Sequence, residues 1–357
     1  MSEKDNLAFS MEITIKESNH LKSIAILMML FLHLFNTLNY DGLFTPLIYI
    51  GEKPLVFYLS LFSDACVPIF AFVSGFGLYY KYRQNKESYN LRSNAKRIYS
   101  LYKTYWIILF IFVLGVGSFL QVDGYPGDVT KFLLAFSGLT ASTYNGAAWF
   151  FTIYVLFVIF SKSIFQILDR FSKSFFVFVL ALYIVAFYFR VYQTDIFSNV
   201  VLDWLHTNLA LFGTTLFQFL LGAYALKYSW KQKVSNIFER IPLKNMAAMI
   251  GILGLIVFHA YVPNFIVAPI TGLAFIMLFT QMSLPKPLES ILDFLTPHAT
   301  NMWLIHMFFY LIFFKDFIYS PKYILPIYLL LILCCVTVSY FINFIIGFRL
   351  TKKIIVN

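Results

Sequence analysis

The sequence has few charged residues. Only 12% of its 357 residues are Asp, Glu, Lys or Arg, whereas 60% are hydrophobic. A water-soluble domain carries roughly 25% charged residues, so this composition excludes a soluble globular protein of this length. It predicts an all-α, polytopic integral membrane protein whose main partner is the lipid bilayer.

Cysteine is also scarce. Cys66, Cys334 and Cys335 all lie within apolar runs, and the last two are adjacent. This spacing provides neither a disulfide framework nor a set of metal ligands, so we interpret all three as buried apolar residues. The sequence has no close group of His, Cys and carboxylate residues, and we predict no metal site.

The first twenty residues mix acidic and basic side chains and lack the basic start and cleavage site of a signal peptide. We therefore expect the first membrane span to direct insertion and to remain in the protein.

Apolar windows of about twenty residues, the length that crosses the hydrocarbon of a bilayer, occur ten times. They cover residues 22–38, 65–82, 98–120, 147–169, 174–192, 208–226, 243–261, 264–283, 300–317 and 322–348. Two further apolar stretches, 42–63 and 130–142, are interrupted by Gly, Pro or charged residues. We interpret these two as interfacial or re-entrant pieces.

The charges of the loops predict the orientation. Lys and Arg are concentrated in 81–103, 161–174 and 227–244, whereas 39–64 and 121–146 have one each. Cytoplasmic loops carry the excess of Lys and Arg, so both termini are predicted to be cytoplasmic. The net charge of +10 then reflects topology, and we expect no nucleic-acid partner.

This orientation divides the chain into three parts. We expect a cytoplasmic N-terminal segment at 1–21, a transmembrane domain at 22–348 and a cytoplasmic tail at 349–357.

The first span contains two ionisable residues, Lys22 and His33, eleven positions apart. Eleven steps of 100° are three turns plus about 20°, so both side chains share one stripe of a helix about 16 Å apart along its axis. Lys22 is predicted at the cytoplasmic mouth and His33 deep in the bilayer. Because an ionisable group facing lipid is costly, the stripe should face a polar cavity. His33 is either a general base or a structural hydrogen-bonding partner of another helix.

Other candidates lie at the entrances of later spans. Arg92, Lys96 and Arg97 open the third span from the cytoplasmic side. They are ordinary positive-inside anchors or ligands for a phosphorylated cosubstrate. In the ninth window, Asn301 lies at the mouth and His306 about one and a half turns further in. A second histidine within a span strengthens the prediction of a polar cavity, and we assign Asn301 and His306 to its wall.

Three further positions, Ser74, Trp149 and Tyr154, are assigned to the pocket. Ser74 precedes Gly75 within a span, and we favour a pocket-lining role for it because no Ser-His-Asp order is visible. The glycines of this stretch predict close helix packing. Trp149 opens the fourth span as an interfacial aromatic residue. His259 lies near an outer helix end, and His20, His206 and His298 receive no role.

Five segments, in order, resemble motifs of the membrane-bound acyltransferase 3 family. They are "KSIAILMMLFLH", "VSGFGL", "RIYSLYKTYW", "AAWFFTIYVLF" and "MWLIHMFF", which span residues 22 to about 310. The first resembles the family's pattern of a basic residue, ten intervening residues and a histidine.

The resemblance implies an enzyme of the bacterial plasma membrane that moves an acyl group, most often acetyl, from cytoplasmic acetyl-CoA to extracytoplasmic glycans. It places the proposed catalytic histidine at His33 and its basic partner at Lys22. The family's paired arginines fall on Asn94 and Arg97, so only the second is present, and Arg92 or Lys96 is expected to substitute. Tyr154 replaces a glutamate of many members, as in the branch that modifies surface polysaccharides.

We therefore expect acetyl-CoA as a cosubstrate with no permanently bound cofactor, and a glycan or lipid-linked sugar as the acceptor. His33 would act as a base or carry the acyl group itself. Any extracytoplasmic hydrolase-like partner would be a separate chain, and a homo-oligomer is also compatible. The alternative function is a glycan or small-molecule exporter that uses the cavity as a path and performs no acyl transfer. Release of CoA from acetyl-CoA distinguishes the two.

Overall fold

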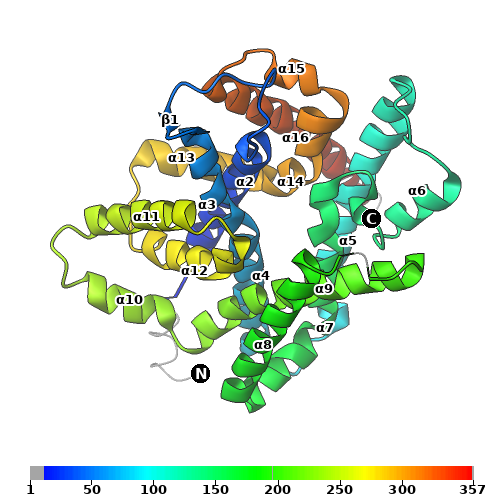
Figure 1. The fold of residues 1–357 in the computed structure, drawn as a ribbon. Helices are drawn as coiled ribbons and strands as arrows, with labels where there is room; N and C mark the ends of the chain where they lie inside the picture. Colours follow the sequence, from blue (N-terminus) through cyan, green and yellow to red (C-terminus); the bar gives the residue numbers. More distant parts are fainter. Residues whose placement is uncertain (1–11, 195, 356–357) are drawn as a thin grey trace.

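A computed structural model describes the backbone of residues 12–194 and 196–355, and the side chains of these ranges as far as residue 347. The described residues form helices, with one hairpin of two-residue strands (Figure 1). The elements are α2 (Ile15–Phe35), β1 (Tyr49–Ile50), β2 (Lys53–Pro54), α3 (Leu55–Phe62), α4 (Cys66–Gln84), α5 (Leu91–Ile108), α6 (Val129–Phe136), α7 (Trp149–Arg170), α8 (Ser172–Val191), α9 (Val200–Lys227), α10 (Trp230–Phe238), α11 (Lys244–Tyr261), α12 (Ala268–Phe279), α13 (Lys286–Leu295), α14 (Ala299–Met307), α15 (Lys315–Tyr319) and α16 (Ile324–Ile355). Two π-helical segments, Leu109–Gly117 and Phe308–Phe313, prolong α5 and α14.

Eight helical segments of the described chain are long and apolar enough to cross a membrane. They coincide with the first seven predicted windows and with the last, and this confirms an all-α, polytopic membrane protein. The other two windows do not reach this length and apolarity. Within 264–283 only the shorter helix Phe265–Phe279 is apolar, and polar residues dilute the helix that occupies 300–317.

The two stretches predicted as interfacial pieces behave differently. Residues 55–63 of the first stretch are part of a continuous 30-residue segment, Leu55–Gln84, which is long enough to span. That part of the prediction is wrong because only a single turn, Ser63–Ala65, separates α3 from α4, and its Asp64 faces a cavity instead of interrupting the span. The second stretch contains α6, whose eight residues are too short to cross a bilayer.

Helices α2 and α4 lie at the centre of the bundle (Figure 1). Helix α4 crosses α9 at very short range, because Gly75 and Gly222 present no side chain at the crossing. A Cβ on Gly75 would lie 1.8 Å from the carbonyl oxygen of Phe219. The glycine packing predicted for this span is therefore confirmed at Gly75, whereas a Cβ on Gly77 would meet nothing within 4 Å.

Ion pairs join the helix ends that the loop charges assign to the cytoplasm. The capping box of α2 contributes Glu17, which lies 2.7 Å from Lys231 of α10. The His20 ring lies 2.7 Å from Asp293 of α13, and Lys86 pairs with Asp169 at the end of α7. Segments predicted to share one side of the membrane thus contact one another.

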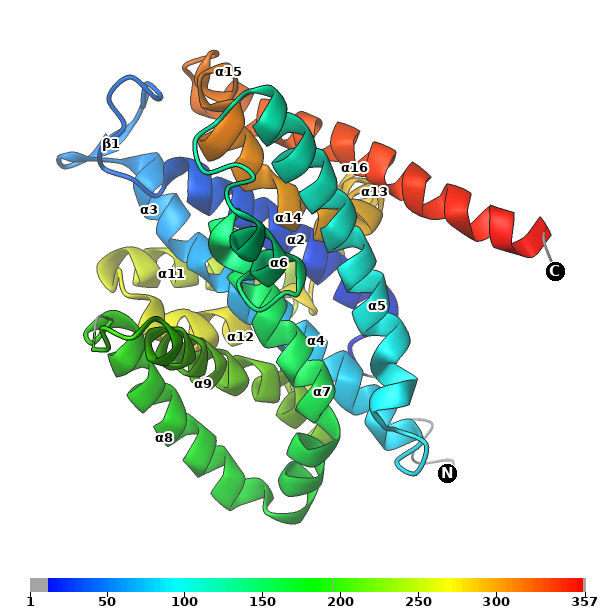
Figure 2. The same ribbon diagram turned by 90° about the vertical axis from the view of Figure 1, so that its right-hand side faces the viewer.

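The first and last helices extend beyond the boundaries predicted for the transmembrane domain. Helix α2 begins at Ile15, before the expected start at 22, and α16 continues past 348 to Ile355. Its second half projects from the rest of the bundle (Figure 2). Residues 1–11 and 356–357 of the two predicted terminal segments lie outside the described residues.

Candidate active site

A cavity of about 720 Å³ runs between α2, α4, α5, α7 and α14. Small-molecule sites typically enclose roughly 300–1,000 Å³. Both Lys22 and His33 line this cavity, as their shared helical stripe predicted. The cavity therefore connects the predicted cytoplasmic mouth of α2 with the deep position of the histidine.

His33 is paired with a second histidine. Its Nδ1 lies 2.7 Å from Nε2 of His306, and the two rings are nearly parallel, at 6°, with centroids 4.9 Å apart. The Tyr310 ring is nearly parallel to both, with its centroid 5.9 Å from each of theirs. His306 is completely buried and does not line the cavity. Its predicted place in the pocket wall is thus wrong, because helix packing turns its ring toward the Nδ1 edge of His33 and away from the cavity.

The surroundings of His306 assign the protons on both rings. Its Nδ1 lies 3.1 Å from the carbonyl oxygen of Met302 and 2.9 Å from that of Trp303. Carbonyl oxygens only accept hydrogen bonds, so Nδ1 carries the proton and Nε2 of the neutral ring has the lone pair. His33 must then donate from Nδ1 to this lone pair.

This hydrogen bond leaves the lone pair of neutral His33 on its Nε2. His33 lines the cavity, and the described residues offer Nε2 no hydrogen-bond partner. A lone pair on an accessible imidazole nitrogen is what a general base requires.

Lys22 and Arg97 line the same cavity from α2 and α5. Two cations in one cavity attract a polyanion such as a phosphorylated cosubstrate. Arg92 and Lys96, the other predicted phosphate ligands, lie on the exposed face of α5 and do not line the cavity. Of the three predicted phosphate ligands on α5, only Arg97 therefore lines the cavity, because the helix turns the other two toward the outside.

Asn301 also lines this cavity. Its Nδ2 donates to Ser339 Oγ at 2.7 Å and to Asn343 Oδ1 at 3.0 Å. His298 Nδ1 lies 2.8 Å from the same Ser339 hydroxyl. This network joins α14 to α16 and holds Asn301 in place as part of the wall.

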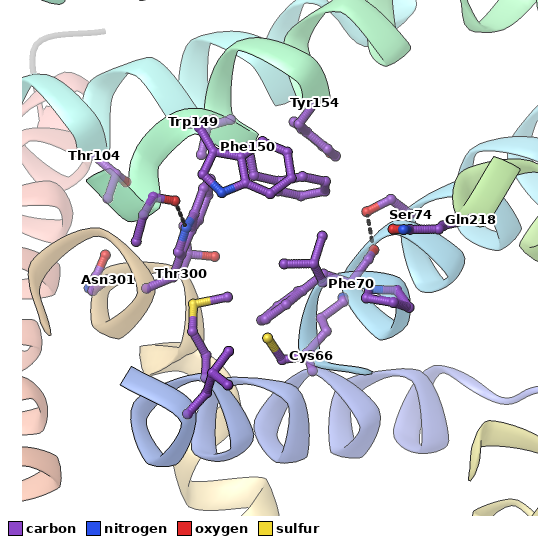
Figure 3. A pocket seen from close by; sticks show the side chains of 18 of the residues that line it. Cys66, Phe70, Ser74, Thr104, Trp149, Phe150, Tyr154, Gln218, Thr300 and Asn301 are labelled. Atoms are coloured by element: carbon purple, nitrogen blue, oxygen red, sulfur yellow. Dashed lines mark hydrogen bonds between the residues drawn. The ribbon is translucent and has the colours of Figure 1, made fainter. Parts of the chain in front are cut away.

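Ser74, Trp149 and Tyr154 also line the cavity, as predicted (Figure 3). The Ser74 hydroxyl donates to the Phe70 carbonyl at 2.7 Å, an i to i−4 bond within α4. Its proton is therefore engaged by the helix and not by a base, which agrees with a lining role. Trp149 and Tyr154 come from the first turns of α7 and cover one side of the cavity (Figure 3).

Residues 15–344 match a family model described as an acyltransferase domain. The chain belongs to the acyltransferase 3 family. Comparisons with curated proteins and with solved structures found no match. The family match covers almost the entire transmembrane region, so the chain is a multi-pass membrane acyltransferase.

The segment from Lys22 to His33, which resembles the family's first motif, lies on α2 with both terminal side chains on the cavity. Asn94, which the resemblance places where the family has its first arginine, is buried on α5. Lys81 of α4 places its Nζ 3.4 Å from Asn94 Oδ1 and donates to the Ser93 carbonyl at 3.0 Å. A cation from a neighbouring helix therefore stands beside the position where the motif has an arginine.

Sequence reasoning missed several polar residues of the cavity wall, among them Asp64, Arg190 and Gln218. The signal for Arg190 was visible, because it is an arginine at the end of an apolar span. Asp64 was hidden by the interpretation that separated α3 from α4. Gln218 is one amide in a long apolar helix and carried no recognisable pattern. The described residues contain no group of three or more His, Cys, Asp or Glu side chains suited to a metal ion.

Proposed function

We propose that this acyltransferase is an O-acetyltransferase of a bacterial plasma membrane. It transfers acetyl from cytoplasmic acetyl-CoA to a hydroxyl of an extracytoplasmic or lipid-linked glycan. The observation that carries the proposal is one cavity with cations at the mouth and, deeper in, a histidine whose Nε2 is free to accept a proton.

The donor enters from the side of Lys22. Its phosphate groups bind Lys22 and Arg97, with Lys81 as a third cation near the entrance. Arg supplies a planar fork of donors for phosphate oxygens and Lys a point charge. The thioester end then extends along α2 toward His33, over a rise of about 16 Å.

The reaction is a single acyl transfer. The acceptor oxygen attacks the carbonyl carbon of the thioester while Nε2 of His33 removes its proton, and the new C–O ester bond replaces the C–S bond. The proton then passes from His33 to the departing sulfur, so the products are the acetylated acceptor and free CoA. General-base catalysis of this kind contributes about 10²–10⁴-fold to the rate.

His306 is a positioning residue in this scheme. When His33 accepts the proton its ring becomes a cation with two N–H donors, and Nε2 of His306 accepts the one that faces it. The bond therefore fixes the reactive tautomer before the proton transfer and stabilises the imidazolium after it.

A covalent acyl carrier would use the same nitrogen. We favour the base role because it needs no change at Nδ1, whereas a neutral acyl-imidazole must lose the Nδ1 proton that binds His306. Labelled acetyl-CoA without acceptor separates the two. The base role predicts no acetyl group on the protein after rapid acid quenching, and the carrier role predicts labelled His33.

The function is tested with the full-length protein in proteoliposomes. Addition of acetyl-CoA and surface glycan from the producing cells should release CoA and give alkali-labile acetate on the glycan. His33→Ala should abolish both, and His206→Ala, which removes a histidine that does not line the cavity, should preserve both. An exporter would move glycan without releasing CoA, and that result would overturn the proposal.

A further inference from the structure

The cavity has a second polar compartment at the ends of helices opposite to the donor cations. Arg190 lies one residue before the end of α8, and Trp149 begins α7. These are the helix ends that the loop charges place on the extracytoplasmic side. Both residues line the cavity, together with Asp64 and Gln218. In the proposed reaction, none of these four residues binds the donor or contacts the His33–His306 pair.

The Arg190 guanidinium lies between two aromatic rings. Its central carbon is 5.0 Å from the ring centroid of Trp149 and 5.0 Å from that of Phe265. Aromatic faces attract a cation but leave the in-plane N–H donors unused. One of these donors, Nη1, reaches Thr214 Oγ1 at 3.3 Å. Within the described residues no carboxylate lies within ion-pair distance of Arg190, although the charge of Asp64 acts on it. Its remaining donors are open to acceptor atoms of water or a ligand.

Asp64 and Gln218 supply the complementary groups. Asp64 Oδ2 lies 3.8 Å from Nε2 of the fully buried His259. Gln218 is 5% exposed, and its Oε1 is buried without a hydrogen-bond partner. Figure 3 shows the Gln218 side chain reaching the cavity from the side of Ser74. An unsatisfied buried amide oxygen costs free energy unless a ligand or water donates to it.

The charges of this compartment select the ligand. The Asp64 carboxylate repels an anionic ligand, and the Arg190 guanidinium repels a cationic one. The two groups together therefore disfavour a ligand that carries a net charge. A hydroxyl both donates and accepts, so vicinal hydroxyls satisfy the carboxylate, the guanidinium and the amide at once. The Trp149 and Phe265 rings add the apolar contact that a sugar ring requires.

We propose that Asp64, Arg190 and Gln218 form the acceptor subsite, which binds an uncharged, hydroxyl-rich sugar ring and directs one hydroxyl toward His33. This inference rests on the proposed function, because it assigns the second substrate of that reaction. It separates the two substrates by the ends of the cavity, with the donor on the side of Lys22 and the acceptor on the side of Arg190.

Binding is tested separately from catalysis. The probe is methyl α-glucoside, with its uronic acid and its 2-amino-2-deoxy analogue as charged comparisons, and binding is followed by saturation-transfer NMR on the purified full-length protein. We expect signal transfer to the neutral glycoside. It should fall at least fivefold in Asp64→Asn and in Arg190→Gln and persist in His33→Ala. The control variants Asp203→Asn and Arg170→Gln, outside the cavity wall, should bind like the wild type.

Steady-state kinetics then show whether each variant changes the KM for the acceptor or the KM for acetyl-CoA. With the surface glycan as acceptor, Asp64→Asn, Arg190→Gln and Gln218→Leu should raise the acceptor KM at least tenfold and leave the acetyl-CoA KM within twofold. Retained thermal unfolding temperatures show that the variants are folded, and Arg190→Lys provides a variant that keeps the charge if Arg190→Gln does not fold.

The outcomes distinguish the two proposals. Glycoside binding that depends on Asp64 and Arg190, without any release of CoA, would support the subsite and overturn the acetyltransferase function. Release of CoA with unchanged acceptor KM in all three variants would overturn the subsite alone. Preferential binding of the uronic acid or the amino sugar would refute the assignment to an uncharged ring.

Discussion

Replacing His306 by leucine should slow acyl transfer about 10- to 100-fold without changing the KM of either substrate. Leucine removes the acceptor that lies 2.7 Å from Nδ1 of His33. Loss of one neutral hydrogen bond costs about 0.5–1.5 kcal/mol, which is roughly 2- to 13-fold in rate. The remainder comes from the fraction of His33 that adopts the other neutral tautomer, whose Nε2 carries the proton and has no lone pair for the acceptor.

His306→Gln is the matched variant. The Gln side chain places an amide group near the position of the histidine Nε2, and its oxygen accepts a hydrogen bond. We therefore expect His306→Gln to retain about one tenth of the wild-type kcat or more, clearly above His306→Leu. Initial rates of CoA release at saturating acetyl-CoA and glycan measure both, and thermal unfolding of each purified variant controls for folding.

A double-mutant cycle with His33 refutes or supports this reasoning. Because His306 acts only through His33, the variant that lacks both should be no slower than His33→Ala alone, so the two losses are strongly non-additive. A further tenfold loss in the double variant would mean that His306 has a function of its own. Equal rates for the wild type and His306→Leu would show that the hydrogen bond to His306 does not control the tautomer of His33.

The remaining predictions concern the donor end and the helix crossing. Lys22→Ala and Arg97→Ala should each raise the acetyl-CoA KM by about 10-fold or more, since a charge-assisted hydrogen bond contributes roughly 1.5–3 kcal/mol. Arg92→Ala, off the cavity wall, should change it less than twofold, and an equal effect of all three would contradict the assigned donor path. Gly75→Ala should prevent stable folding because its Cβ would meet a backbone oxygen at 1.8 Å. Gly77→Ala, with open space around its Cβ, should keep or raise the unfolding temperature in the same thermal scan.

The relation between Lys22 and His33 was predictable because it depends on one helix. The period of 3.6 residues fixes the angle between two positions whatever surrounds them, and apolar length marked most of the spans. The close packing of α4 against a neighbouring helix was likewise predictable at Gly75. That Gly77 takes no part in it depends on the rotation of α9 against α4, which no local pattern encodes.

The partner of His33 was not predictable from spacing. His306 lies 273 positions further along the chain, and nothing in the sequence pairs it with His33. Whether a second histidine faces the cavity or the first histidine depends on how α14 packs on α2. In the same way, helical spacing grouped Arg92 and Lys96 with Arg97, yet only Arg97 turns toward the cavity.

The measurement that tests the account most directly is the initial rate of acetyl transfer by His33→Ala, in purified full-length protein at saturating acetyl-CoA and glycan. The account predicts a fall of at least about 100-fold, the contribution of a general base, with an unchanged unfolding temperature and an acetyl-CoA KM within twofold of the wild type. A correctly folded His33→Ala variant that retains a third or more of the wild-type rate would contradict it.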